Sequence, residues 1–352
     1  MPVPRGTLPA MGSGVDIRGR DVVTLDTFSA DEIRHVTARA RELKSKGDAM
    51  GQPLAGRSLA MVFFDPSLRT RASFSIAFGS LGGTVIDLVA GRDLWPLEMR
   101  EGAVMDDLAD EHVGDAVRVL SEYADIIAIR ALARGGDWAQ ARRDTVIVSF
   151  QKHAGVPIFN MESVLDHPCQ ALGDALTIED ALGETQGKRI ALVWTYHPKA
   201  RPLAVPHGVG MMASKLGMHL SVARPEGYDF DPALGRTMQH EAERSGGSLS
   251  FVTDAEEAVE GAEIVYAASW GSPALHAAPE DERALRDRYR DRIVTKELMA
   301  RSAEGRFMHA MPIRRNVEAE DAVVDAASSL VVEQAANRLH VQRALFREVL
   351  GV

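Results

Sequence analysis

The sequence has 352 residues, of which 45% are apolar and 26% charged, and at roughly 150 residues per domain this length predicts two domains with a sizeable core. The composition excludes a disordered or fibrous protein, and the lack of any apolar stretch of about 18 residues excludes a membrane-spanning helix. Fifty acidic against forty basic side chains give a formal charge of −10, which argues against a nucleic-acid partner.

The first residues predict a flexible lead and a cytoplasmic protein. Residues 1–24 open with a segment rich in Pro and Gly, and this segment lacks the charged start and apolar core of a secretory signal. The single cysteine, Cys169, has no second cysteine with which to form an intrachain disulfide.

A helix is predicted after the lead. Ser29 and Glu32 form a capping box at its start, and Gly47 ends the helical pattern. Apolar residues recur on one face of this helix, at Ile33, Val36, Ala40 and Leu43.

Short β-rich runs then alternate with helical patterns. Strands are predicted at residues 58–64, 84–89, 125–130, 156–161, 189–195, 219–224, 248–252, 263–268 and 307–311. Most of these runs are apolar without alternation, which is typical of strands buried on both faces. The predicted fold class is therefore α/β, with largely parallel sheets flanked by helices.

A polar stretch at residues 181–189 precedes a fresh series of strands and helices. Such stretches mark domain boundaries. We expect domains at 25–165 and 166–332, followed by an amphipathic helix at 333–352.

Residues 63–71, Phe-Phe-Asp-Pro-Ser-Leu-Arg-Thr-Arg, lead from a buried strand into a helix. Ser67 stands at the N-cap position, where free amide groups, the hydroxyls of Ser67 and Thr70, and the guanidinium of Arg69 or Arg71 are the donors that a phosphate needs. A capped helix with solvated arginines would have the same sequence, so this motif alone leaves both interpretations open.

Polar residues also follow other predicted strands. Arg130 ends the strand 125–130, His-Pro-Cys-Gln (167–170) follows 156–161, and the segments 194–199 and 309–316 follow strands of the second half. Ligands of open α/β sheets bind at such strand ends. The sequence contains no catalytic-serine elbow, zinc motif or glycine-rich nucleotide loop, and we expect neither a metal nor an organic cofactor.

Together, Ser-X-Arg-Thr-Arg (67–71), His-Pro-X-Gln (167–170) and His-X-X-Pro (309–312) resemble the aspartate and ornithine carbamoyltransferase family, from about Leu25 to the C-terminus. Three further stretches, 93–98, 194–199 and 336–342, are similar to its N-acetylornithine branch, and the N-succinylornithine branch shares part of them. The resemblance implies a carbamoyl-phosphate-binding domain at 25–165, an amino-acid-binding domain at 166–332, and a C-terminal helix that packs back on the first. It also implies a backbone knot in the loop that begins at His197.

The resemblance implies roles for individual residues. Carbamoyl phosphate would contact Ser67, Leu68, Arg69, Thr70, Trp95, Arg130, His167, Gln170, Met311 and Arg338, of which Arg69, Thr70, Arg130 and His167 would be catalytic. The acceptor would face Glu162, Met311, Arg314 and Glu318, while Asp110 and Glu111 would discriminate its acyl group. The family implies a homotrimer with shared active sites, in which Trp95 reaches into a neighbouring subunit.

The implied reaction transfers the carbamoyl group of carbamoyl phosphate to the δ-amine of N-acetyl-L-ornithine, giving N-acetyl-L-citrulline and phosphate for arginine biosynthesis. Three positions depart from the branch: Ala310 replaces a cysteine, Ala268 replaces a lysine, and Glu318 stands where a carbamate-modified lysine can occur. Two alternatives stay open. One is a carbamoyltransferase for N-succinyl-L-ornithine, ornithine or another amine, and the other is a non-catalytic sensor of a phosphate ligand.

Overall fold

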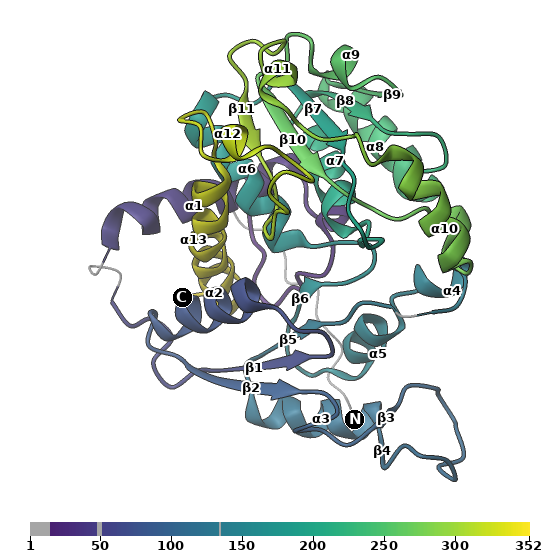
Figure 1. Ribbon diagram of the computed structural model, residues 1–352. Helices are drawn as coiled ribbons and strands as arrows, with labels where there is room; N and C mark the ends of the chain where they lie inside the picture. The colour runs from purple at the N-terminus through teal and green to yellow at the C-terminus, as the bar shows by residue number, and fades with distance from the viewer. Residues whose placement is uncertain (1–14, 48–50, 134) are drawn as a thin grey trace.

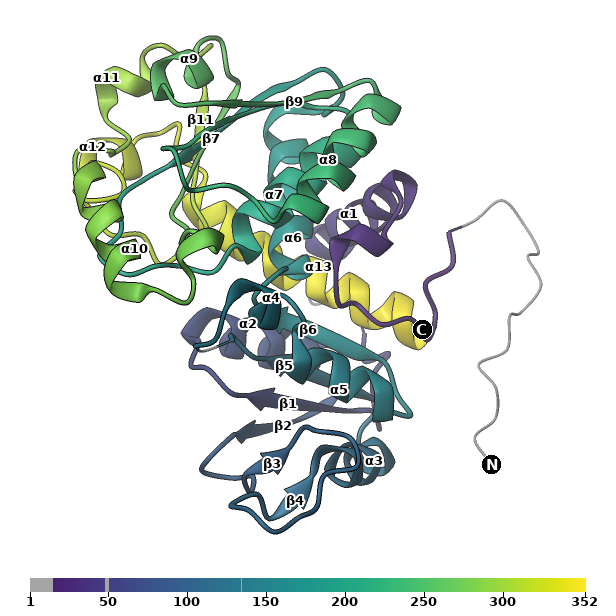
Figure 2. The same ribbon diagram turned by 90° about the vertical axis from the view of Figure 1, so that its right-hand side faces the viewer.

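The computed structural model describes residues 15–47, 51–133 and 135–352, and it contains a parallel sheet in each half of the molecule (Figures 1 and 2). The first sheet has the order β2-β1-β5-β6, with β1 (Ser58–Phe63), β2 (Thr84–Val89), β5 (Ile126–Arg130) and β6 (Ile158–Glu162). The second has the order β11-β10-β7-β8-β9, with β7 (Arg189–Trp194), β8 (His219–Ala223), β9 (Ser248–Val252), β10 (Ile264–Ala268) and β11 (Arg306–Met308). Neighbouring strands in both sheets pair in parallel, which confirms the α/β class.

Helices pack around both sheets. In chain order they are α1 (Ala30–Lys46), α2 (Leu68–Gly79), α3 (Val113–Tyr123), α4 (Trp138–Ala141), α5 (Thr145–His153), α6 (Pro168–Leu182), α7 (Ala204–Lys215), α8 (Pro232–Ser245), α9 (Ala255–Val259), α10 (Pro279–Arg286), α11 (Lys296–Met299), α12 (Asp321–Val324) and α13 (Val331–Leu350). The described residues also include 3-10 turns at η1 (Leu25–Thr27), η3 (Pro273–Leu275) and η4 (Asp287–Tyr289). Within the described part of the chain, no helix is both long and apolar enough to cross a membrane.

The alternation of side chains explains why the central strands are apolar throughout. In β7, Leu192 and Trp194 are buried in the main core, whereas Ala191 and Val193 are buried in a second cluster with residues of α9. Each face of the sheet therefore carries its own apolar layer, and neither face of this strand needs polar residues.

The C-terminal helix α13 runs between the two halves of the molecule (Figure 2). Its Phe346 ring lies 5.7 Å from the Phe74 ring, 5.0 Å from the Phe78 ring and 5.3 Å from the Phe159 ring, measured between centroids. These contacts join α13 to α2 and β6 of the first half. Aromatic contacts of this kind add stability beyond the area that they bury.

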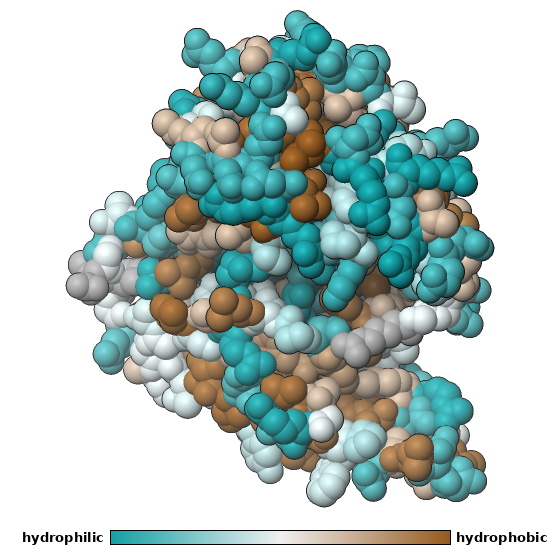
Figure 3. Space-filling view, in the orientation of Figure 1, coloured by the Kyte–Doolittle hydropathy of each residue, from teal (hydrophilic) through white to brown (hydrophobic). Residues whose placement is uncertain are grey.

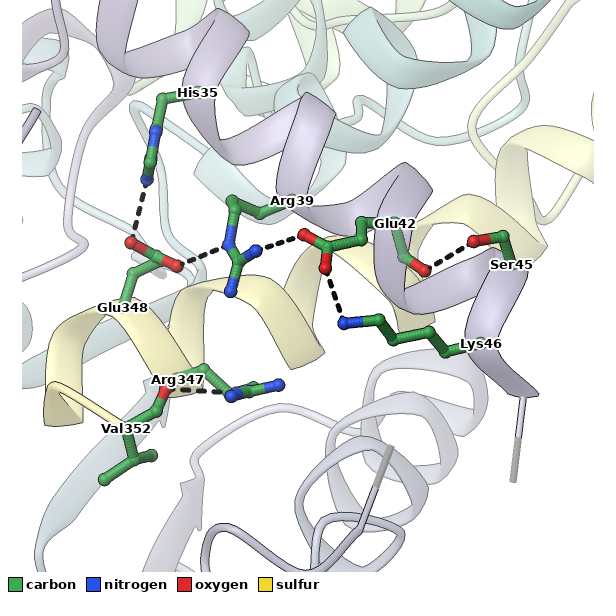
Figure 4. Close-up of polar contacts among 8 residues, drawn as sticks. All are labelled: His35, Arg39, Glu42, Ser45, Lys46, Arg347, Glu348 and Val352. Atoms are coloured by element: carbon green, nitrogen blue, oxygen red, sulfur yellow. Dashed lines mark hydrogen bonds and ion pairs between the residues drawn. The ribbon is translucent and has the colours of Figure 1, made fainter. Parts of the chain in front are cut away.

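An ion-pair cluster joins the C-terminal part of α13 to α1 (Figure 4). Glu348 accepts a hydrogen bond from Arg39 Nε at 2.9 Å, and its other oxygen lies 2.8 Å from His35 Nε2. Burial raises the pKa of Glu348, but the bonds from His35 and Arg39 outweigh it and leave the pKa below its usual value. The capping box that was predicted at Ser29 and Glu32 is present at the start of α1.

Two features differ from the sequence analysis. Residues 1–14 of the expected lead lie outside the described residues, but Ile17 and Val22 are buried against the rest of the molecule, so the flexible lead does not extend to residue 24. Val22 is fully buried, and it exchanges backbone hydrogen bonds of 2.8 Å with Ile158 and Asn160 as an extra parallel bridge beside β6. The strands β3 (Leu97–Glu98) and β4 (Glu111–His112) were missed because two residues show no periodicity.

Candidate active site

The Ser-X-Arg-Thr-Arg motif lies where β1 leads into α2. Ser67 is the N-cap of α2, and its hydroxyl accepts a hydrogen bond from the Thr70 amide at 3.4 Å. The sequence left open whether Arg69 or Arg71 serves the site. Arg71 Nη1 pairs with Asp87 at 2.7 Å, and its guanidinium carbon lies 4.5 Å from the Phe63 ring centroid, so Arg69 is the cation of the motif that has no ion pair among the described residues.

Cationic and imidazole groups from four segments converge beside this helix start. Arg338 of α13 donates from Nη2 to the Thr70 hydroxyl oxygen at 3.0 Å. Burial and the positive charge of Arg130, at the end of β5, lower the pKa of both Arg69 and Arg338. Burial and the charges of Arg338 and Arg130 also lower the pKa of His167. The structure therefore brings together all four residues expected to be catalytic.

Buried nitrogen atoms in this cluster have no hydrogen-bond partner in the described part of the chain. They are Nε of Arg69, Nε of Arg130, Nε of Arg338 and Nδ1 of His167. Burial lowers the pKa of Arg338, and of Arg69 with a contribution from the Arg130 charge. Holding desolvated donors without acceptors costs free energy, and an anionic or carbonyl ligand would repay it.

His167 is a neutral imidazole. Burial lowers its pKa well below 6.5, and the charges of Arg338 and Arg130 lower it further. The backbone amide of His167 donates to Asp166 at 2.6 Å, and that carboxylate also accepts from the Thr24 hydroxyl and the Leu25 amide, both at 2.8 Å. The segment before α1 thus fixes the turn that positions His167.

A buried polar network connects this cluster to the second half of the molecule. Asp174 accepts from Gln170 at 2.7 Å, from Gln334 at 2.7 Å and from the Tyr266 hydroxyl at 2.9 Å. Gln334 in turn accepts from the His309 amide at 3.0 Å. Asp174 is fully buried, and burial raises its pKa to about 6. The sequence analysis missed Asp174 and Gln334, because helical positions inside an apolar pattern carry no motif.

Glu162 lies between the arginine cluster and a small pocket in the second half of the molecule. Its carboxylate pairs with Arg130, and its backbone has a φ of +148°. The register between β5 and β6 shifts at Arg130, directly beside this residue. Irregular pairing and a sparsely populated φ re-aim side chains at functional sites. The pocket is lined by Glu162, Arg201, Pro202, Val205, Ala267, Ala268, Ser269, His309, Ala310, Pro312 and Glu318.

Of the other residues expected to contact the acceptor, Glu318 lines the small pocket, whereas Arg314 and Met311 do not. Glu318 is buried, accepts from the Arg314 amide at 2.8 Å, and lies 3.3 Å from His309 Nε2. Burial raises the pKa of Glu318, but contact with His309 outweighs this and leaves the pKa below its usual value. The Arg314 side chain donates to His197 Nε2 at 3.0 Å and is not part of the pocket lining. Met311 is 36% exposed and also lies outside that lining, although Ala310 and Pro312 belong to it.

A larger cleft of about 870 Å³ adjoins the small pocket, since Arg201 and Pro202 line both. Its walls come from both halves, with Leu132 and Trp138 on one side and Ser272 and His276 on the other. The cleft gives a substrate-sized ligand access to the pocket between the halves. Among the described residues, no cluster of three or more His, Cys, Asp or Glu could hold a metal ion.

Three of the expected site residues lie elsewhere in their own chain. Trp95, Asp110 and Glu111 are on the segment around β3 and β4, which extends from the first sheet at the base of the molecule (Figure 1). Trp95 is 68% exposed, and none of the three residues lines the cleft or the pocket.

Family models match both halves of the chain. The model described as "Aspartate/ornithine carbamoyltransferase, carbamoyl-P binding domain" matches residues 20–180. The model described as "Aspartate/ornithine carbamoyltransferase, Asp/Orn binding domain" matches residues 188–349.

Individual relatives are similar over most of their length. The N-acetylornithine carbamoyltransferase of Xanthomonas campestris pv. campestris is 40% identical over 309 residues, which cover 87% of this chain and 91% of that protein. An ornithine carbamoyltransferase of Thermococcus kodakarensis is 34% identical over 341 residues, covering 96% and 98%. A crystal structure of acetylornithine transcarbamylase complexed with acetylcitrulline matches with a TM-score of 0.91 and 37% identity, covering 95% of this chain and all of the other.

Proposed function

We propose, on the premise that the chain belongs to the aspartate/ornithine carbamoyltransferase family, that it transfers the carbamoyl group of carbamoyl phosphate to the δ-amine of N-acetyl-L-ornithine. The products are N-acetyl-L-citrulline and phosphate, a step of arginine biosynthesis. The observation that carries this proposal is the set of buried, unpartnered nitrogens of Arg69, Arg130, Arg338 and His167 around the start of α2. Such a set favours a ligand with a phosphate and a polarised carbonyl group.

The phosphate group binds at the N-terminus of α2. The amides of Leu68 and Arg69 have no hydrogen-bond acceptor among the described residues, and the helix dipole favours an anion there. Ser67 supplies a hydroxyl and Arg69 a charged fork of donors at the same end.

The carbamoyl oxygen binds beside the phosphate, where Thr70, Arg130 and His167 converge. Arg338 already donates to the Thr70 oxygen, and the Thr70 hydroxyl hydrogen has no acceptor among the described residues, so it is free to donate to the substrate. Gln170 contacts the carbamoyl amide from the α6 side. Because these donors lie in a buried site and are fixed before reaction, each contributes about 3 kcal/mol to stabilising charge that develops on the oxygen.

The reaction needs one nucleophile and one leaving group. The neutral δ-amine attacks the carbamoyl carbon, a C–N bond forms, and the C–O bond to phosphate breaks. The proton that the amine loses passes to the departing phosphate, so no protein base is required. Holding both substrates in contact supplies much of the rate.

The acceptor occupies the pocket that Glu162, Ala268, Ala310 and Glu318 line, and we keep the Met311 backbone and Arg314 as proposed contacts of the acceptor beside that lining. N-acetylornithine is favoured over ornithine as the acceptor because the N-acetylornithine relative is 40% identical, against 34% for the ornithine enzyme. Acidic side chains at Asp110 and Glu111 would disfavour a negatively charged succinyl group.

We also propose a homotrimer whose subunits share active sites. The first half of the chain exposes large apolar side chains on α2, on α3 and on the segment around β3 and β4, at Leu68, Ile76, Trp95, Val104, Leu108 and Tyr123. Figure 3 shows hydrophobic residues at several places on the lower half of the molecule. Exposed apolar patches of this kind favour association, and an adjoining subunit would bring Trp95, Asp110 and Glu111 to a neighbour's cleft. The cytoplasmic location and the knot stay predictions.

Initial-rate measurements with carbamoyl phosphate and a panel of amines test the proposal. The panel contains N-acetyl-L-ornithine, N-succinyl-L-ornithine, L-ornithine and an amine without an amino-acid end. We expect the highest kcat/KM with N-acetyl-L-ornithine. Release of phosphate without a ureido product, or a higher kcat/KM for another amine, would contradict it.

A further inference from the structure

The pocket proposed for the acceptor contains a single guanidinium among its lining residues, that of Arg201. Arg201 lies in the loop between β7 and α7 and is half-buried. Its side chain makes no hydrogen bond or ion pair with the residues that the structure describes. It also lines the larger cleft, so it stands at the junction of the two spaces.

The other charges of this pocket are negative or already paired. Glu162 is engaged with Arg130, and Glu318 contacts His309 and the Arg314 amide. Ala268, where the resembling branch has a lysine, adds only a methyl group to the lining. A carboxylate that entered this pocket would be repelled by two acidic side chains and needs a cation within contact distance.

The backbone of Arg201 is held in place by its neighbours. Its carbonyl accepts a hydrogen bond from the Gly271 amide at 2.9 Å, which joins the loop to the segment after β10. A side chain at Gly271 would meet Ala200 at 2.9 Å, so the two segments are closely packed. Pro202 follows directly and restricts the backbone of Arg201. A positioned guanidinium binds a carboxylate through two parallel hydrogen bonds.

We propose that Arg201 is a specificity-determining residue that binds the α-carboxylate of the acceptor amino acid and supplies the charge missing at Ala268. This inference rests on the proposed function and adds the recognition of one substrate group. Arg314 is a weaker candidate because its guanidinium is engaged with His197. Lys199 is exposed and lines the larger cleft, but it is not part of the small pocket.

The test compares two acceptors on matched variants. N-acetyl-L-ornithine carries the α-carboxylate, whereas N-acetylputrescine has the same amine and acetyl group without it. The variants are Arg201→Ala, Arg201→Lys, the double variant Arg201→Ala with Ala268→Lys, and Lys199→Ala, which removes a nearby positive charge as the control. KM for carbamoyl phosphate is measured in each.

We expect the wild type to prefer N-acetyl-L-ornithine about 10- to 100-fold in kcat/KM, the range of a charged hydrogen bond. Arg201→Ala should lose this preference through a higher KM for N-acetyl-L-ornithine, with KM for carbamoyl phosphate unchanged. Arg201→Lys and the double variant should regain part of it, and Lys199→Ala should keep it in full.

An unchanged preference in Arg201→Ala would overturn the assignment, and so would a rise in KM for carbamoyl phosphate instead. If Lys199→Ala lost the preference as fully as Arg201→Ala, the effect would come from the local positive charge in general and not from a contact with Arg201. This result would also overturn the assignment. A wild-type protein that does not carbamoylate N-acetyl-L-ornithine would refute the proposed function itself, and the role of Arg201 with it. The wild-type measurement therefore separates the two failures.

Discussion

Replacing Arg69 with alanine should abolish turnover and leave the fold intact. Arg69 lies in the first turn of α2, and its Nε is buried without a partner, while its side chain forms no ion pair with the described residues. Burial lowers the pKa of the guanidinium, so the folded protein holds this cation at a cost. Its removal should change the free energy of unfolding by about 1 kcal/mol or less, since no cap, core contact or pair is lost.

The catalytic loss should be much larger. Removing one donor from an oxyanion site costs about 3 kcal/mol, a factor of about 10² to 10³ in rate. Arg69 has the further task of stabilising the departing phosphate through charged hydrogen bonds. We therefore expect kcat/KM for Arg69→Ala to fall by about 10³ or more.

Arg71→Ala is the matched control for this experiment. It removes a guanidinium two residues away that pairs with Asp87 and covers the Phe63 ring. The control should lose about 1 kcal/mol of stability and keep its activity. Steady-state kinetics and urea unfolding of both variants measure the two effects. Near-normal activity in a folded Arg69→Ala protein, or an equal loss in Arg71→Ala, would refute the assignment of this loop.

Three further predictions follow from the site and the fold. N-acetyl-L-ornithine should be carbamoylated faster than L-ornithine, since a site shaped for an acyl amide solvates an α-ammonium poorly; equal kcat/KM values would contradict this. Trp95→Ala subunits refolded together with Arg69→Ala subunits should regain activity, because some shared sites then contain both native residues; mixtures as inactive as their parents would remove Trp95 from the site. Burial lowers the pKa of His207 from 6.5 to about 4, so between these values the unfolded chain binds more protons. The contribution of His207 to the free energy of unfolding is therefore fully present above about pH 6.5. It is lost as the pH falls toward 4, at up to about 1.4 kcal/mol per pH unit. His207→Gln should lack that contribution in urea unfolding followed against pH, and identical slopes would exclude the role.

The fold was predictable because its signals are local. The nine predicted runs, most of them apolar without alternation, correspond to strands of the two parallel sheets, and their ends differ from the observed ones by at most three residues. The strand predicted at 156–161 begins at Ile158, since Pro157 has no amide hydrogen with which to enter the ladder. The strand predicted at 307–311 ends at Met308, where the chain turns into the site loop.

Parts of the candidate site were predictable because motifs at strand ends meet at one edge of a parallel sheet. Arg130, His167 and the start of α2 come together for this reason. Arg338 comes from the opposite end of the chain, and only the resemblance placed it there.

Other features depend on long-range contacts that no local pattern encodes. The pairing of Asp174 with Gln334 joins residues 160 positions apart. The packing of Val22 against β6 was missed because a single bridge leaves no strand pattern. The sequence offered both Arg201 and Lys199 as cations that could compensate for Ala268, and only the structure, which places Arg201 in the same pocket as Ala268, distinguishes between them.

The most direct test of the central claim is to identify the product. The purified protein is incubated with ¹³C-labelled carbamoyl phosphate and an equimolar mixture of N-acetyl-L-ornithine, N-succinyl-L-ornithine and L-ornithine, and the labelled ureido products are separated by mass. The proposed function predicts that the label enters N-acetyl-L-citrulline first and in the largest amount. The proposed function would be contradicted if the label entered another acceptor preferentially. It would also be contradicted if the folded wild-type protein formed no labelled ureido product.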